Sequence, residues 1–169
     1  MTIEVSHGVS RLEIEKISSQ YGIFFSDDYQ DFLFNYNGLF VGNNSYCTIP
    51  FSKVDDGNID FQELYGINSS NPLFDLANVN DIRDEINVFK NPFIIGADPG
   101  GNLFLFSGND NDDAIYYWDR AHIHFDDNFD YHEVNEEGNV YRISDNFTTF
   151  YNEIMLNING DKSITKVVL

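Results

Sequence analysis

The chain has 169 residues, 42 % of them hydrophobic and 16 % aromatic, which is enough apolar material to bury the core of one domain. Its 28 acidic residues against nine lysines and arginines give a formal net charge of −19, which disfavours binding to nucleic acid or to anionic lipid. The single cysteine, Cys47, excludes an internal disulfide.

The N-terminal residues lack the basic start and apolar run of a secretory signal. No apolar run approaches the ~20 residues that a membrane-spanning helix needs. We therefore expect a cytoplasmic protein that contacts no membrane.

Two helices are predicted in the first forty residues. The first begins at a capping box formed by Ser10 and Glu13 and ends at Gly22. The second begins at Ser26 and ends at Gly38, and four of its apolar residues share one helical face: Tyr29, Phe32, Leu33 and Tyr36.

The middle of the chain predicts a strand over 45–51 and a third helix from Asn80 to Phe89, whereas 58–67 fits either a strand or a short helix. Closely spaced strands are then expected at 93–97, 103–107, 114–119, 121–125 and 139–143. A last helix is predicted to open at Ser144 and to end before Gly160.

Short connections between strands require hairpins, so the sheet should be mainly antiparallel. We predict an α+β fold in a single domain, 1–169, with a core of about 9–158. The mainly antiparallel sheet is expected to be flanked by N-terminal helices and a C-terminal helix.

The stretch PFIIGADPGGNLFLF, residues 92–106, carries a glycine pair between two apolar runs. A phosphate-binding loop needs a helix after its glycines, and here an extended run follows. We therefore predict a type II turn, with Pro99 at its second position and Gly100 in the positive-φ third position.

Residues that could carry chemistry are few. His122 and His124 would share one face of a strand and, with Asp126 or Glu133, could hold a metal, but a polar outer face is the favoured interpretation. Cys47 follows a tyrosine in a predicted strand and is expected to be a buried, inert thiol. No pattern of a nucleophile with its base is present, so we predict neither catalysis nor a cofactor.

The stretch GNDNDD, residues 108–113, places Asp110 and Asp112 at the spacing of a calcium loop. It lacks the glycine at position six and the glutamate at position twelve of such a loop. We interpret it as a solvated hairpin tip, with weak calcium binding as the alternative.

Acidic residues concentrate between Gly108 and Gly138, where Arg120 is the only lysine or arginine and aromatic residues are interleaved. Carboxylates beside aromatic anchors suit a basic protein partner, whereas the alternative is that the aromatics face the core and the acids face water. The residues that we predict to contact or steer a partner are Asp110, Asp112, Asp113, Asp126, Asp127, Asp130, Tyr117 and Trp118.

Four segments together resemble the SUKH superfamily of the Smi/Knr type. They are FSDDYQDFLFNYNG (25–38), PFIIGADPGGNLFLFS (92–107), AIYYWDRAH (114–122) and ISDNFTTFYNEI (143–154). The chain departs from the family in having Arg120 where a histidine often follows the Trp-Asp pair, and in its acidic 108–138 region.

Bacterial members of that superfamily are immunity proteins that neutralise a polymorphic or contact-dependent toxin, often a nuclease, whereas fungal members are regulatory hubs. The resemblance therefore implies a non-enzymatic immunity protein whose partner is a basic toxin domain. A regulatory scaffold for a signalling or cell-wall protein is the alternative, and a metal protein using His122 and His124 is a third.

Overall fold

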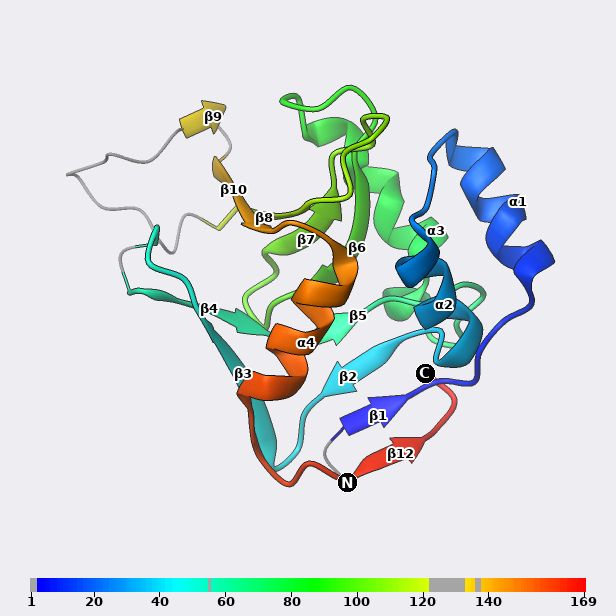
Figure 1. The fold of residues 1–169 in the computed structure, drawn as a ribbon, viewed down its shortest axis with the longest axis vertical. Coiled ribbons are helices and arrows are strands. Elements are labelled where there is room, and N and C mark those ends of the chain that lie inside the picture. Colours follow the sequence, from blue (N-terminus) through cyan, green and yellow to red (C-terminus); the bar gives the residue numbers. More distant parts are fainter. Residues whose placement is uncertain (1–2, 55, 122–132, 136–137) are drawn as a thin grey trace.

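The computed structural model describes residues 3–54, 56–121, 133–135 and 138–169, which form an α+β fold (Figure 1). The α-helices of this part are α1 (Arg11–Tyr21), α2 (Asp27–Asn35), α3 (Leu76–Val79) and α4 (Phe147–Asn157), and the 3-10 helices are η1 (Pro72–Phe74) and η2 (Asn80–Glu85).

Two sheets carry the strands. The larger has nine strands in the order β12-β1-β2-β5-β6-β7-β8-β10-β9, and the smaller has three in the order β11-β3-β4. All paired strands run antiparallel except β1 and β12, so the predicted α+β fold with a mainly antiparallel sheet is confirmed. The strands are β1 (Ile3–Val5), β2 (Leu39–Val41), β3 (Ser45–Pro50), β4 (Asn58–Phe61), β5 (Glu63–Leu64), β6 (Phe93–Ala97), β7 (Leu103–Phe106), β8 (Ile115–Asp119), β9 (Glu133–Asn135), β10 (Gly138–Ser144), β11 (Ile158–Gly160) and β12 (Ile164–Lys166).

The core lies around β6 and β7, in which every residue is buried. Aromatic rings from α2 and α4 pack against β7, with ring centroids 5.1 Å apart for Tyr29 and Phe106 and 5.2 Å apart for Phe104 and Phe150. Such offset and edge-on ring pairs stabilise a core beyond the burial of their area. The helices α2 and α4 therefore cover the centre of the sheet (Figure 1).

The predicted first helix is confirmed at both ends. The Ser10 hydroxyl accepts a hydrogen bond of 3.3 Å from the backbone N–H of Glu13, and the Glu13 carboxylate accepts one of 3.0 Å from the Ser10 N–H. Gly22 closes the helix in the left-handed conformation with φ 61°. Both ends of this helix are therefore set by local sequence.

The predicted start of the last helix is wrong. The Asn146 side chain caps α4, accepting a hydrogen bond of 2.8 Å from the backbone N–H of Thr149. Because β10 continues pairing with β8 as far as Ser144, that residue is part of a strand and cannot open a helix.

The turn between β6 and β7 also differs from the prediction. The positive φ, 88°, falls on Gly101, and Gly100 does not adopt one. The backbone N–H of Gly101 donates to the carbonyl oxygen of Asp98 over 3.3 Å, and that of Asp98 donates to Asn102 over 2.9 Å. A turn followed by a left-handed glycine therefore joins the strands, in place of a type II turn.

Tertiary pairing decides the remaining segments. Residues 58–64 form β4 and β5. The predicted helix over 80–89 is wrong: within that range only Asn80–Glu85 is helical, as the 3-10 helix η2, and the α-helix α3 precedes it. The strands β1, β9, β11 and β12 were not predicted, and the strand expected at 121–125 lies outside the described residues apart from residue 121.

Candidate functional site: an acidic hairpin beside an exposed phenylalanine

The hairpin between β7 and β8, residues 107–114, carries three of the predicted partner-binding acids. Asp110 and Asp113 are exposed. Asp112 is half-buried, and its carboxylate accepts hydrogen bonds from the Ser107 hydroxyl at 2.6 Å and the Tyr116 hydroxyl at 3.1 Å. Asp112 therefore shapes the hairpin, whereas Asp110 and Asp113 face solvent.

The hairpin approaches the end of α1 closely. Gly108 has φ 67°, and a Cβ at this position would lie only 1.7 Å from the carbonyl oxygen of Asn91. The Asn91 side-chain amide in turn donates to the carbonyl oxygens of Tyr21 and Gly22, at 3.1 and 3.0 Å. Only glycine fits at position 108, and its fit places the hairpin beside the connection between α1 and α2.

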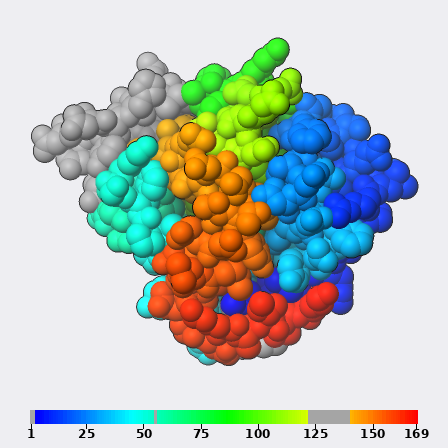
Figure 2. Space-filling view, viewed as in Figure 1, coloured from blue at the N-terminus to red at the C-terminus, as the bar shows by residue number. Residues whose placement is uncertain are grey.

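A hollow of about 310 Å³ separates the hairpin from this connection. Phe24, which lines it, is 76 % exposed, whereas its neighbour Phe25 is buried in the core. Figure 2 shows the two segments side by side on the surface. We call Phe24, Asp110, Asp113 and the hollow between them the acidic hairpin site.

Sequence reasoning missed Phe24. Its signal is the adjacent pair Phe24 and Phe25 just before a helix, since only one of two neighbouring side chains can enter the core there. From the sequence we expect Tyr117 and Trp118 of β8 to be the aromatic side chains exposed beside the carboxylates. Phe24 takes that place in the structure.

Tyr117 and Trp118, both predicted to contact a partner, lie in the interior. Their exposed fractions are 0 % and 1 %. Adjacent residues of a strand point to opposite faces of the sheet, so the burial of both Tyr117 and Trp118 means that both faces of the sheet are covered at this point of β8. These two side chains offer no contact area to a partner in this structure.

Asp126, Asp127 and Asp130 lie outside the described residues. The segment that carries them follows the C-terminal end of β8, whereas the hairpin precedes its N-terminal end. These two ends of a five-residue strand are about 13 Å apart.

Candidate reactive groups give no catalytic arrangement in the described part of the chain. Burial raises the pKa of the Cys47 thiol to about 12, and the thiol faces the carbonyl oxygen of Ile154 at 3.5 Å. No three of the histidine, cysteine, aspartate or glutamate residues that are described could hold a metal together. His122 and His124 are not among them.

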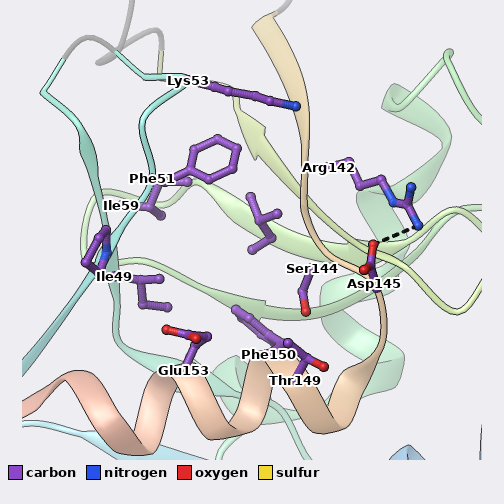
Figure 3. A pocket seen from close by; sticks show the side chains of 12 residues that line it. Ile49, Phe51, Lys53, Ile59, Arg142, Ser144, Asp145, Thr149, Phe150 and Glu153 are labelled. Atoms are coloured by element: carbon purple, nitrogen blue, oxygen red, sulfur yellow. Dashed lines mark ion pairs between the residues drawn. The ribbon is translucent and has the colours of Figure 1, made fainter.

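A further hollow, of about 480 Å³, lies between the end of β3, the end of β10 and α4 (Figure 3). Apolar side chains form its floor, including Ile59 and Phe150. On its rim, Arg142 pairs with Asp145 at 3.1 Å, and Figure 3 shows this pair at the edge of the hollow, away from the apolar floor. The arrangement brings no nucleophile next to a base.

A comparison with protein families matches residues 8–153 to the SMI1 / KNR4 family (SUKH-1). The chain belongs to the SMI1/KNR4 family. The match covers the helices α1 and α2 and most of the large sheet, so it confirms the resemblance that the four sequence segments indicated. A comparison with curated proteins found no match.

The SMI1/KNR4 family includes immunity proteins to polymorphic toxins, and its members are generally not catalysts. The matched range contains both Phe24 and the hairpin 107–114, so the acidic hairpin site is part of the family domain. Within the part of this SMI1/KNR4 chain that the structure describes, no helix is long and apolar enough to cross a membrane.

Proposed function

We propose that this SMI1/KNR4 protein is an immunity protein, which binds the toxic domain of a cognate polymorphic or contact-dependent toxin and neutralises it. It acts by stoichiometric binding in the cytoplasm and has no reaction of its own. Membership of a family that includes such immunity proteins supports this proposal.

The observation that carries the proposal is the acidic hairpin site. Phe24 offers a large exposed apolar surface beside the exposed carboxylates of Asp110 and Asp113, on a chain with a formal net charge of −19. Aromatic side chains supply much of the binding energy of protein interfaces, and complementary charge speeds association. A basic toxin domain fits both features, and a nuclease is the expected kind because its surface must attract phosphates.

Asp126, Asp127 and Asp130 add three negative charges to the chain just beyond β8. We propose that they contribute to the field that attracts the toxin. This part of the proposal depends on charge alone. The field of these carboxylates extends about a Debye length, 8 to 10 Å at ordinary salt, so it can attract a basic surface without direct contact.

The test uses the toxin domain encoded beside the gene of this protein. The purified domain is assayed for its toxic activity, such as cleavage of nucleic acid, while the full chain is added in steps. We expect the activity to fall linearly and to vanish near one equivalent. Retention of activity with the chain in large excess would contradict the proposal, and binding without loss of activity would favour a regulatory scaffold.

A further inference from the structure

A hollow of about 500 Å³ opens at the end of β7 opposite to the acidic hairpin site. Strands β5, β6 and β7 and the turn after Asp98 line it on one side, and the segment from Pro72 to Ile82 lines it on the other. This hollow could not be predicted from the sequence, because segments that are far apart along the chain form it.

Glu63 places a half-buried carboxylate in the hollow, and its side chain has no cation partner among the described residues. Arg120 is the one lysine or arginine found in the lining. Its guanidinium pairs with Glu85 at 3.3 Å and lies 5.2 Å from the ring centroid of Trp118. The Tyr65 hydroxyl lowers the pKa of Glu63 and so favours its ionised form, but by less than burial raises it.

The second carboxylate of the hollow is in a different state. Asp98 is buried, and its Oδ1 and Oδ2 accept hydrogen bonds of 2.7 to 2.9 Å from the backbone of Gly100 and Asn102 and from the side chains of Asn102 and Tyr117. These four donors satisfy Asp98 internally. Of the two carboxylates, Glu63 is therefore the one that a cation from a partner would neutralise.

Ionisation of Glu63 lowers the free energy of unfolding. Burial raises the pKa of Glu63 to about 6, so above that pH the folded chain holds a charge in a poorly hydrated place. Half-buried charges without an internal partner destabilise a fold, and proteins retain them at binding sites.

The walls of the hollow are apolar where a long side chain would pass. Leu73 is 76 % exposed, and Val79, Ile82, Pro99 and Leu103 line the same space. Lysine and arginine combine an aliphatic stem with a cationic head, so they can pack along apolar walls while the head reaches a carboxylate.

We propose that this hollow binds a lysine or arginine side chain of a protein partner, with Glu63 receiving the cation and Leu73 and Ile82 packing against the stem. That the partner is a toxin domain rests on the function proposed above. Binding of an alkyl cation in the hollow does not depend on that function, so the cation site and the proposed function can be contradicted separately.

The first test uses the isolated chain labelled with ¹⁵N and the probe n-butylguanidinium, with n-butanol and butyrate as controls. We expect the probe alone to shift the backbone amide signals of residues 62–65 and 72–82, with saturation at millimolar concentration. Binding should be about tenfold weaker at pH 5 than at pH 7.5, because Glu63 becomes protonated while the guanidinium keeps its charge. Tyr65, Asp98 and Arg120 are the other ionisable groups that line the hollow.

Two variants make this test specific. Glu63→Gln should abolish the shifts at 62–65 and 72–82, whereas Glu15→Gln, which removes an exposed charge on α1, should leave them intact. Equal shifts for wild type and Glu63→Gln, or shifts with butanol as large as with the cation, would overturn the proposal.

The second test measures the dissociation constant for the toxin domain. Glu63→Gln is expected to raise it about tenfold or more, with no change for Glu15→Gln. If wild type binds no toxin domain but binds n-butylguanidinium, the proposed function fails and the cation site stands. If wild type binds the domain and Glu63→Gln binds it equally well, the cation site is not part of the interface and this inference fails.

Discussion

The hydroxyl of Tyr117 donates a hydrogen bond of 2.8 Å to Oδ2 of Asp98, which links the middle of β8 to the turn between β6 and β7. Asp98 is thus a buried acceptor for four donors. The glycine pair that follows it closes the turn around this carboxylate.

The first prediction concerns Asp98. Asp98→Ala should lower the free energy of unfolding by about 3 kcal/mol or more, because four donors, three of them in buried hydrogen bonds, lose their acceptor together. Urea denaturation at pH 7 measures the change. Asp113→Ala, which removes an exposed carboxylate, is the control and should stay within about 0.5 kcal/mol of wild type.

The second prediction compares one substitution at two tyrosines. The buried hydroxyl of Tyr29 has no hydrogen-bond partner among the residues that the structure describes, whereas that of Tyr117 has Asp98. Tyr29→Phe should therefore raise the free energy of unfolding by about 1 kcal/mol, and Tyr117→Phe should lower it by about 1.5 kcal/mol or more. The account of both residues is wrong if urea denaturation gives the two changes the same sign.

The third prediction concerns the exposed acids of the hairpin. The double variant Asp110→Asn with Asp113→Asn should slow association with the toxin domain by about tenfold at low salt and flatten the salt dependence of the rate. Stopped-flow kinetics at two ionic strengths measures both effects. The pair Glu15→Gln with Glu153→Gln removes equal charge from exposed positions of α1 and α4, and it should have a smaller effect.

The fourth prediction concerns Phe24. Phe24→Ala should leave stability almost unchanged, since the ring is 76 % exposed, but should speed dissociation from the toxin domain by about tenfold or more. Surface plasmon resonance measures the rate. The matched control is Leu156→Ala on α4, where the side chain is 72 % exposed. If Leu156→Ala weakens binding as much as Phe24→Ala does, the effect is not specific to Phe24 and its place in the interface is contradicted.

The fifth prediction is a pH dependence set by Glu63. Its pKa is raised from 4.5 to about 6 in the folded chain, so the ionised form opposes folding as the pH rises through this range. Above pH 6, Glu63→Gln should be more stable than wild type by about 1 kcal/mol, a figure reduced for the partial exposure of the group. Below pH 4.5 the difference should vanish. A difference that is independent of pH would contradict the assignment.

Local signals in the sequence were sufficient for several elements. The box of Ser10 and Glu13 and the left-handed Gly22 both act within one turn of helix, so they could be predicted without knowledge of the fold. The apolar runs on either side of Asp98 likewise predicted two buried strands in the right places.

The failures arise where a distant segment decides the outcome. Alternation along β8 predicted one buried face, but it cannot reveal that both faces are covered, which is why Tyr117 and Trp118 were placed at the surface. The strand β12 has three residues and, in the described part of the chain, pairs with β1 alone, so nothing in its own sequence indicated it. Phe24 and Glu63 became visible only once the hairpin and the segment 72–82 had been placed beside them.

The central claim is that this protein neutralises a partner by binding it and not by chemistry. The most direct measurement is the titration of the neighbouring toxin domain's activity with the full chain at concentrations far above the dissociation constant. The account predicts a straight line that reaches zero activity at one equivalent. Full activity at a tenfold excess of the chain, or inactivation by a small fraction of an equivalent as turnover would give, contradicts it.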